Sequence, residues 1–374
     1  MLARLTAAKA VSNSAFRWMA FFLPTLVVAF SASTGQLTTV LGLGEMAGLA
    51  MLLVGRHLDR DRERTMVVLS LGLTAVGLLL ATMGSLAAFA IGYLIVMVGV
   101  ALCTVSGHAY LGRRVRFARR ARAIGVFETS WASALLVGAP LAAVLITSFG
   151  WRGPFVVFSG LAVAVGLVLW AAEDRAVVLA DASSAAALDE RPRLTAKAWM
   201  TVAASSAIGI TGLTTVVIAG TWLDEAFGLS TEGVGLIAMA FGAAELLASS
   251  SSAAIADRAG PGRATRAALI LTTIGLVVMT QADSSLLLGA AGLFLFFVGF
   301  EFAIVTSFSI VSEAMPSARG RVLALNTGTG TVLRGFGVSM SGVLYGAFGI
   351  NGPVGLSMAT GLVAIALLAA VERR

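Results

Sequence analysis

The sequence predicts an all-α membrane protein in which twelve transmembrane helices form two six-helix bundles that repeat each other in parallel. Three observations predict this fold: the composition, twelve long apolar runs, and a repeat between the two halves. Of the 374 residues, 58% are apolar and 12% are charged, and the mean hydropathy is +0.94. Soluble domains contain about 45–50% apolar and about 25% charged residues. The chain therefore has too few charges to cover a water-soluble enzyme, and we expect a multi-pass protein of the lipid bilayer.

The composition also excludes several kinds of chemistry. The single cysteine, Cys103, and the two histidines, His57 and His108, are too few for a disulfide scaffold or a cysteine-based zinc site. The sequence contains no P-loop motif, which excludes an ATP-driven pump. We therefore expect no metal, no cofactor and no enzymatic activity.

A helix that crosses the bilayer needs about 20 mostly apolar residues, and the chain offers twelve such runs. They cover residues 11–31, 35–55, 66–84, 87–110, 123–148, 154–172, 198–222, 232–254, 266–282, 285–310, 321–346 and 352–371. The runs are continuous and lack the alternation of a transmembrane β-strand. The first run can also be read as a cleaved signal peptide, but polytopic proteins commonly keep the first span as an anchor, and we interpret it so.

The positions of the basic residues predict the orientation in the membrane. With a cytoplasmic N-terminus, 23 of the 26 Lys and Arg residues lie in cytoplasmic segments, and only Arg152 lies in an outside loop. Because Lys and Arg collect on the cytoplasmic side, we expect both termini in the cytoplasm and the protein in the bacterial inner (plasma) membrane. Attraction to anionic lipids explains the net charge of +7, so no nucleic-acid partner is expected.

The two halves of the chain match each other. Residues Phe149–Pro154 open the sixth span and Phe348–Pro353 open the twelfth, 199 residues later. The longest polar stretch separates the halves, so we expect an N-terminal six-helix bundle over 1–172, a cytoplasmic linker over 173–197 and a C-terminal six-helix bundle over 198–374. Six is an even number, so both halves have the same orientation, and parallel repeats of this kind are typical of transporters.

The loop between the second and third spans carries the most specific motif. Gly55-Arg56-His57-Leu58-Asp59-Arg60 through Arg64 resembles a loop signature of the major facilitator superfamily, which often has glycine where Arg62 stands. Asp257-Arg258 is a weaker copy between the eighth and ninth spans. The stretch from Arg122 to Trp131, with Gly150-Trp151-Arg152, is typical of the twelve-span bacterial drug and metabolite exporters of this family.

The resemblance implies a cytoplasmic latch that favours the outward-open state. Gly55 would allow close approach of helices, and Asp59 would face the positive N-terminal end of the eleventh span. Arg64 is expected to pair with an acidic residue of the same loop; the alternative is that these basic residues only set the orientation. The expected latch residues are Gly55, Asp59, Arg60, Arg64, Asp257 and Arg258.

Two departures from the resembled family weaken the case for proton antiport. The fourth span lacks the membrane-embedded arginine that many proton-coupled members carry. The glycine motif of the fifth span is reduced to Gly138-Ala139-Pro140. For Gly138 and Pro140 we expect roles in helix packing and bending.

Ionisable residues inside the spans are the candidate functional groups, because each costs about 2.5–3.5 kcal/mol on insertion scales. Spans 3, 6, 9 and 12 have none in their apolar interiors, and in the resembled fold these four spans face lipid. We therefore expect the six charges to line a cavity, with Asn326 as a further polar contact. By depth, Arg17 can pair with Glu128, and Arg334 with Glu301 or Glu45. The six are Arg17, Glu45, Glu128, Glu245, Glu301 and Arg334.

These features predict a monomeric secondary transporter that exports a small organic molecule by alternating access, with protons as the coupling ion. One or more of Glu45, Glu245 and Glu301 is expected to carry the proton or to contact a cationic group of the substrate. The alternative for these charges is a permanent ion pair that holds two helices in register. The other functions left open are a nutrient symporter, a uniporter, a lipid flippase and a non-transporting membrane sensor.

Overall fold

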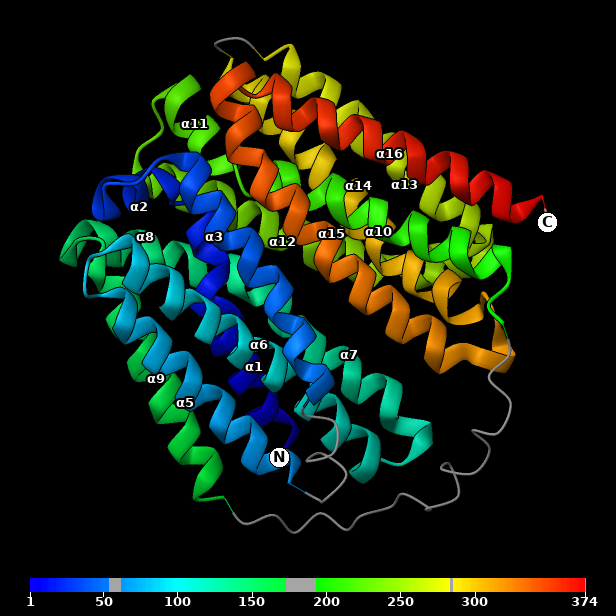
Figure 1. Ribbon diagram of the computed structural model, residues 1–374, viewed down its shortest axis with the longest axis horizontal. Coiled ribbons are helices and arrows are strands. Elements are labelled where there is room, and N and C mark those ends of the chain that lie inside the picture. Colours follow the sequence, from blue (N-terminus) through cyan, green and yellow to red (C-terminus); the bar gives the residue numbers. More distant parts are fainter. Residues whose placement is uncertain (54–61, 173–192, 283–284, 374) are drawn as a thin grey trace. The chain divides into compact units, whose positions relative to one another are not determined.

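A computed structural model describes residues 1–53, 62–172, 193–282 and 285–373, and the regular structure of these residues is entirely helical. The predicted all-α class is confirmed (Figure 1). The elements are α1 (Leu2–Arg17), η1 (Trp18–Ala20), α2 (Leu23–Phe30), α3 (Thr34–Met46), η2 (Ala47–Leu53), α5 (Glu63–Ala81), α6 (Leu86–Arg114), α7 (Phe117–Ser133), η3 (Ala134–Gly138), α8 (Ala139–Phe149), α9 (Arg152–Trp170), α10 (Ala196–Val216), α11 (Ala219–Phe227), α12 (Thr231–Ala259), α13 (Pro261–Thr280), α14 (Leu286–Glu313), η5 (Pro316–Ala318), α15 (Arg319–Phe348) and α16 (Asn351–Glu372).

Most of the predicted spans are helices long and apolar enough to cross a membrane. Nine such helices occur in the described residues, and a tenth is obtained when α1 and α2 are counted as one bent span. The other two predicted spans correspond to α3, which η2 continues, and to α15, which has 30 residues but is rich in glycine and threonine. The helices therefore agree with the predicted membrane fold, and twelve spans are compatible with them.

The contacts divide the chain into two compact units, which we describe separately. The first unit comprises Met1–Met19, Thr25–Ala32 and Ala47–Leu188. The second comprises Ala20–Pro24, Ser33–Met46 and Asp189–Arg374, so it includes α3. The domain boundaries expected from the sequence, at 172 and 198, remain a prediction.

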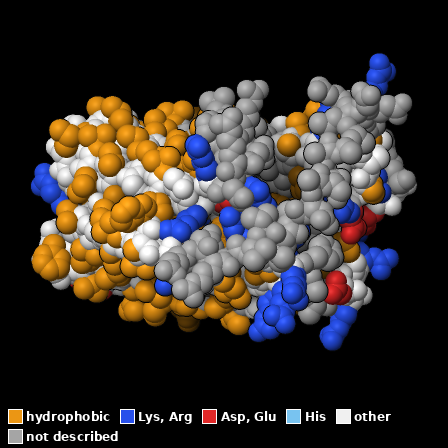
Figure 2. Space-filling model, turned by 90° about the horizontal axis from the view of Figure 1, so that it is seen from below, with side chains coloured by type: hydrophobic (Ala, Val, Ile, Leu, Met, Phe, Trp, Pro, Cys, Tyr) orange, Lys and Arg blue, Asp and Glu red, His pale blue; other side chains and the backbone are white. Residues whose placement is uncertain are grey.

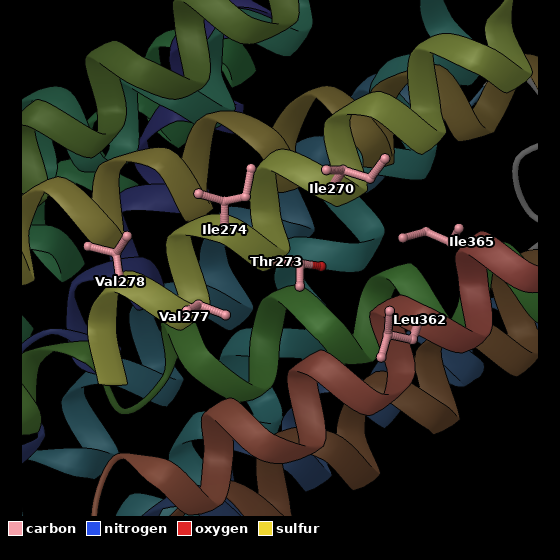
Figure 3. Close-up of a pocket in the computed structure, with 7 residues that line it drawn as sticks. All are labelled: Ile270, Thr273, Ile274, Val277, Val278, Leu362 and Ile365. Carbon is pink, nitrogen blue, oxygen red and sulfur yellow. The ribbon is translucent and has the colours of Figure 1, made fainter. Parts of the chain in front are cut away.

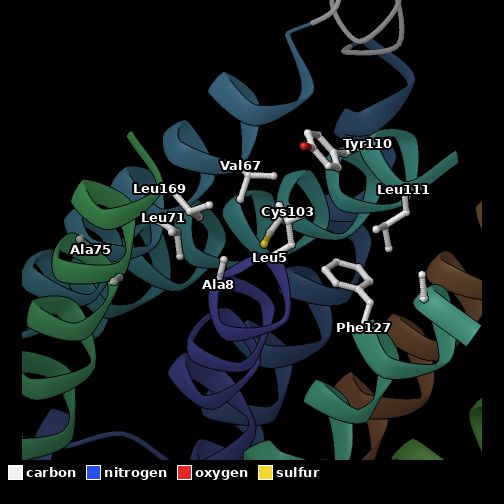
Figure 4. Close-up of a cluster of buried hydrophobic side chains, with 12 residues drawn as sticks. Leu5, Ala8, Val67, Leu71, Ala75, Cys103, Tyr110, Leu111, Phe127 and Leu169 are labelled. Carbon is white, nitrogen blue, oxygen red and sulfur yellow. The ribbon is translucent and has the colours of Figure 1, made fainter. Parts of the chain in front are cut away.

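The core of the first unit is built around α1. This helix packs against α6, α7 and α9, while α5 packs against α6 and α9. Leu5 and Ala8 of α1 lie in one buried cluster with Cys103 of α6 and Phe127 of α7 (Figure 4). Lys9 and Glu128 directly follow two of these core residues, so the apolar cluster fixes the position of both charged side chains.

The second unit repeats this packing. Its helix α10 packs against α14 and α16, and α13 packs against α14 and α16. A Cβ at Gly77 would lie 2.4 Å from the carbonyl oxygen of Gly92, and a Cβ at Gly275 would lie 2.6 Å from that of Gly292. These glycines let the backbones of α5 and α6, and of α13 and α14, touch at positions 198 to 200 residues apart. The repeat seen in the sequence is therefore also a repeat of helix packing.

Two spans are not regular helices along their whole length. The first span bends by 78° between Leu2–Ala20 and Leu23–Phe30, and Pro24 lies at the second position of the latter helix. In the fifth span, the π-helical turn Ala134–Gly138 precedes Pro140. Proline removes a backbone donor, and π turns inside α-helices are frequent at functional sites. Both irregular segments are therefore places where a helix can change shape.

The surface of the described residues carries many large apolar side chains. Leu167, Val168 and Trp170 of α9 and Leu362 and Val363 of α16 are exposed. Figure 2 shows apolar side chains gathered over broad areas, with Lys and Arg side chains in separate groups. Exposed apolar areas of this extent mark a surface that contacts a membrane or a partner, which agrees with a multi-pass membrane protein.

Candidate functional site

Helix α1 carries three long polar side chains on one face. Lys9, Asn13 and Arg17 follow one another at intervals of four residues, a spacing that places side chains above one another on a helix. All three residues are buried. Because α1 packs against α7, this polar face meets the polar residues of the fifth span.

The carboxylate of Glu128 is the meeting point of two basic side chains. Lys9 Nζ lies 2.6 Å and His108 Nε2 lies 2.7 Å from the same atom, Glu128 Oε1. The Lys9 side chain is only 4% exposed, whereas those of Glu128 and His108 are 44% and 40% exposed. Phe127 closes the apolar side of this cluster, with Lys9 Nζ 4.5 Å from its ring centroid. We call Lys9, His108 and Glu128 the basic–acidic triad.

The other two residues of the α1 polar face also contact α7. Asn13 Nδ2 donates to Ser130 Oγ at 3.4 Å. Arg17 Nη1 donates to the carbonyl oxygen of Trp131 at 2.7 Å, and its guanidinium lies 4.0 Å from the centroid of the Trp131 ring. Arg17 thus contacts Trp131 while Glu128 contacts Lys9 and His108, and the expected pairing of Arg17 with Glu128 remains a prediction.

In the second unit, Glu45 of α3 meets Arg334 of α15. Arg334 Nε lies 3.5 Å from Glu45 Oε2, and Arg334 Nη2 lies 3.5 Å from Thr331 Oγ1. The side chains of Glu45 and Arg334 are 18% and 32% exposed, respectively. Of the two partners that the sequence allows for Arg334, the structure brings Glu45 to it.

Close packing of α3 and α15 surrounds this ion pair. A Cβ at Gly42 would lie 2.3 Å from the carbonyl oxygen of Gly335, and a Cβ at Gly335 would lie 2.5 Å from that of Gly42. The Thr38 hydroxyl accepts a hydrogen bond from the backbone N–H of Gly342 at 3.2 Å. Backbone contact three residues before Glu45 and directly after Arg334 therefore brings the two charged side chains to the same place.

Two further carboxylates are buried in the second unit. Ser249 of α12 donates to Glu301 Oε1 at 2.7 Å, and Glu301 is 6% exposed. Glu245 precedes Ser249 by one helical turn and is also buried. Because residues four apart lie on the same helix face, Glu245 lies on the side of α12 that faces α14.

Asn326 lies buried on α15, two helical turns before Arg334. Its Oδ1 atom has no hydrogen-bond partner among the described residues. Near this position, Ser206 of α10 is 3.3 Å from the Thr329 hydroxyl. The α10–α15 contact therefore places two hydroxyls about one turn along α15 from Asn326.

Three of the expected latch residues, Gly55, Asp59 and Arg60, lie outside the described residues. Arg64 donates to the carbonyl oxygens of Leu169, at 3.0 Å, and Trp170 at the end of α9. Its expected pairing within the loop stays a prediction, because Asp59 and Asp61 lie outside the described residues. Asp257 and Arg258 are exposed at the end of α12.

The acidic residue next to Arg64 has two other partners. Glu63 is fully buried, and its two carboxylate oxygens accept from Arg113 at 2.9 Å and from Arg114 at 3.1 Å. The start of α5 is thereby tied to the end of α6.

The expected packing residues lie where the fifth span meets α1. A Cβ at Gly138 would lie 2.7 Å from Ser14 Oγ, so a larger residue there would displace α1. Pro140 is the second residue of α8 and follows the π turn.

A groove of about 270 Å³ lies between α13 and α16 (Figure 3). Its lining is apolar except for one hydroxyl, and it contains no charged group. The groove thus lacks the polar groups that would orient a substrate. The lining residues are Ile270, Thr273, Ile274, Val277, Val278, Leu362 and Ile365.

Sequence reasoning did not select two residues of the basic–acidic triad. The apolar run that predicts the first span begins at residue 11, so the sequence places Lys9 in a cytoplasmic segment, whereas helix α1 begins at Leu2 and includes it. The spacing of Lys9, Asn13 and Arg17 is the signal that could have found it. His108 stands at the end of an apolar run, and nothing in the sequence indicates its contact with Glu128, 20 residues away.

Within the described residues no group of three or more His, Cys, Asp or Glu side chains could hold a metal ion.

Comparisons with known proteins agree on one family. A model of the Major Facilitator Superfamily matches residues 6–337. The uncharacterized MFS-type transporter YwfA of Bacillus subtilis (strain 168) is 24% identical over 343 residues, 87% of this chain and 81% of that protein.

Solved structures show the same fold. The chain is similar to a D-xylose-proton symporter with a TM-score of 0.79 at 14% identity, covering 98% of this chain and 96% of the other. It is also similar to a bacterial homolog of the human lysosomal transporter Spinster, in an inward-facing and unoccupied conformation. That match has a TM-score of 0.77 at 13% identity and covers 100% of this chain and 94% of the other.

Proposed function

Since this chain belongs to the major facilitator superfamily and is thus a secondary transporter, not an enzyme, we propose that it exports a small organic molecule in exchange for protons. The transporter acts as a monomer by alternating access in the bacterial inner membrane. Both of its termini lie in the cytoplasm, in agreement with the distribution of Lys and Arg.

The observation that carries this proposal is the Glu45–Arg334 pair. The two groups lie near the middle of their spans, they approach only to 3.5 Å, and both are partly exposed. A carboxylate at such a depth is costly unless it is paired or protonated. A proton that binds Glu45 neutralises it and releases Arg334, so the pair can link proton binding to a movement of α3 against α15.

Glu301 and Glu245 are the second group of proton-binding candidates. They are buried on neighbouring helices, and Glu301 accepts a hydrogen bond from Ser249. A protonated Glu301 can keep this contact by donating to the hydroxyl, because a hydroxyl both donates and accepts. The hydrogen bond between Ser249 and Glu301 is therefore compatible with proton binding at Glu301.

The direction of transport is proposed from the sequence. The stretch Arg122–Trp131 and the residues Gly150-Trp151-Arg152 resemble those of bacterial exporters. Export driven by protons requires that proton entry and substrate exit occur in one cycle.

Transport by proteoliposomes with an imposed pH gradient tests the proposal. The probes are ethidium as an organic cation, benzoate as an organic anion and a neutral methyl glycoside. We expect an inward proton gradient to accelerate the exit of one of these probes from the wild-type vesicles. We expect E45Q to abolish this acceleration, and E301Q to reduce it, because glutamine cannot carry the proton.

The matched control is E232Q, which removes a carboxylate at the start of α12 and should leave transport unchanged. Proton-driven transport that is equal in wild type, E45Q and E301Q would contradict the coupling role of these residues. Acceleration only when protons and probe move in the same direction would replace export by symport.

A further inference from the structure

The basic–acidic triad of the first unit is a second place where a proton can bind. Lys9 and His108 both direct a nitrogen to Glu128 Oε1, at 2.6 Å and 2.7 Å. The charges in the mid-span pair of the second unit are a carboxylate and a guanidinium, and a guanidinium does not lose its proton in proteins. The triad instead contains histidine, the side chain that changes charge in the physiological pH range.

The contact with Glu128 determines which nitrogen of His108 is available. A carboxylate accepts hydrogen bonds, so Nε2 carries the hydrogen in the contact with Glu128 Oε1, and Nδ1 of the neutral ring has a free lone pair. The side chains of His108 and Glu128 are 40% and 44% exposed, so water can reach them. The site therefore has both a proton acceptor and access to water.

Lys9 is the buried member of the triad, whereas the side chains of His108 and Glu128 are partly exposed. Its side chain is 4% exposed and lies over the Phe127 ring. Phe127 belongs to the apolar cluster that includes Leu5 and Ala8 (Figure 4). A buried ammonium is stable only when it is paired. The Lys9 ammonium therefore stays in contact with the Glu128 carboxylate, and His108 is the member of the triad that combines a free lone pair with access to water.

The neighbouring charged and titratable groups on α1 and α6 have contacts of their own. From α1, Arg17 contacts the carbonyl oxygen and ring of Trp131, one turn beyond Glu128. Farther along α6, Arg113 and Arg114 contact Glu63. From the middle of α6, the thiol of Cys103 lies in the apolar cluster.

We infer that Lys9, His108 and Glu128 form a second proton-binding site, in the first unit, in which His108 takes up the proton and its contact with the Glu128 carboxylate stabilises the imidazolium. This inference rests on the proposed proton-coupled transport and adds a second proton site to it. The proton passes from hydronium to His108 Nδ1, which leaves a water molecule and a positively charged imidazole. The triad gains one positive charge in this step, His108 keeps its contact with Glu128, and Lys9 is a positioning residue.

Proton binding at His108 can be measured without knowledge of the substrate. The chain has two histidines, so the variant H57Q carries His108 as its only histidine. Its imidazole, labelled with 13C at Cε1, is titrated by NMR in lipid nanodiscs between about pH 5 and 8. The same titration is recorded with E128Q, E128D and K9M added to H57Q.

We expect one titration step for His108. E128Q and K9M should move its midpoint in opposite directions, by roughly half a pH unit or more, because they remove neighbours of opposite charge. E128D keeps the carboxylate and should stay near the H57Q value. The control K197M removes an exposed lysine and should leave the midpoint unchanged.

A midpoint that is equal in H57Q, E128Q and K9M, or no titration in this range, would overturn the inference. E128D is the folded reference for E128Q, because it keeps the carboxylate. A His108 midpoint in E128Q that equals the midpoint in E128D would also overturn the inference.

The transport assay separates this inference from the proposed function. H108N should change the pH dependence of proton-driven probe exit, while exchange of the probe at equal pH on both sides continues. If H108N leaves the pH profile unchanged while E45Q abolishes coupling, the triad is not a coupling site and the proposed function stands. If wild-type vesicles move the probe without protons, the proposed function fails even where His108 titrates.

Discussion

The two units both bury charged groups but arrange them differently. In the first unit, two basic groups converge on one carboxylate oxygen at 2.6 Å and 2.7 Å, and an apolar cluster lies behind Lys9. In the second unit, Glu45 and Arg334 approach only to 3.5 Å, and Glu301 is bonded to a hydroxyl. The first arrangement favours a stable site and the second favours a pair that separates easily.

The repeat of the chain extends to its packing but not to its charges. The glycine contacts between α5 and α6 recur between α13 and α14 at a distance of 198 to 200 residues. The residues 199 positions after Lys9, His108 and Glu128 carry no charge. The glycine contacts between neighbouring helices are thus kept in both halves, whereas the charged residues of each half differ. The three uncharged counterparts are Ile208, Ser307 and Thr327.

The largest difference between the units is expected in stability. E128Q leaves Lys9 buried without its charged partner, which we expect to lower the free energy of unfolding by about 3 kcal/mol. E45Q breaks a longer pair and leaves a cation, Arg334, that is 32% exposed where Lys9 is 4% exposed, and here we expect a loss of less than about 1 kcal/mol. Unfolding by SDS titration measures both values. Equal losses would remove the distinction between a stable site and a separable pair.

The repeated glycine contacts should respond alike in both units. G77V and G275V each force a side chain against a backbone carbonyl on the neighbouring helix, and we expect losses of about 1–3 kcal/mol for each. Gly72 of the same helix α5 has open space at its Cβ position, so G72V is the matched control. A large loss in only one unit would show that the packing is not repeated.

The smallest effect concerns a hydrogen bond found in the second unit. The hydroxyls of Thr265 on α13 and Thr306 on α14 are 2.7 Å apart and buried. The residue 198 positions before Thr265 is Val67, so the first unit lacks this hydroxyl. We expect T306V to cost about 0.6 kcal/mol in the SDS titration, the average for such bonds in membranes. A loss several times larger than this value would indicate that the two hydroxyls contribute to the polar site of the second unit.

The sequence predicted the helical membrane fold and the family because both depend on long stretches. Each span is an apolar run of about 20 residues, and small errors at its ends do not change the fold. The bend of the first span and the irregular turn of the fifth lie near Pro24 and Pro140, where proline breaks the backbone hydrogen bonding.

The pairing of the charges could not be predicted in the same way. Position along a span gives the depth of a residue, but not the direction in which its side chain points around the helix axis. Glu45 and Glu301 were equally possible partners of Arg334 for this reason, and contact with Glu45 is set by the close approach of α3 and α15 at Gly42 and Gly335. Lys9 was missed because helix α1 extends beyond its apolar run.

The pH inside proteoliposomes, recorded with a lumenal dye while a transported probe leaves down its own gradient, tests proton exchange most directly. The account predicts that the lumen of wild-type vesicles acidifies as the probe leaves, and that E45Q prevents this acidification. Exit of the probe at constant lumenal pH would contradict it.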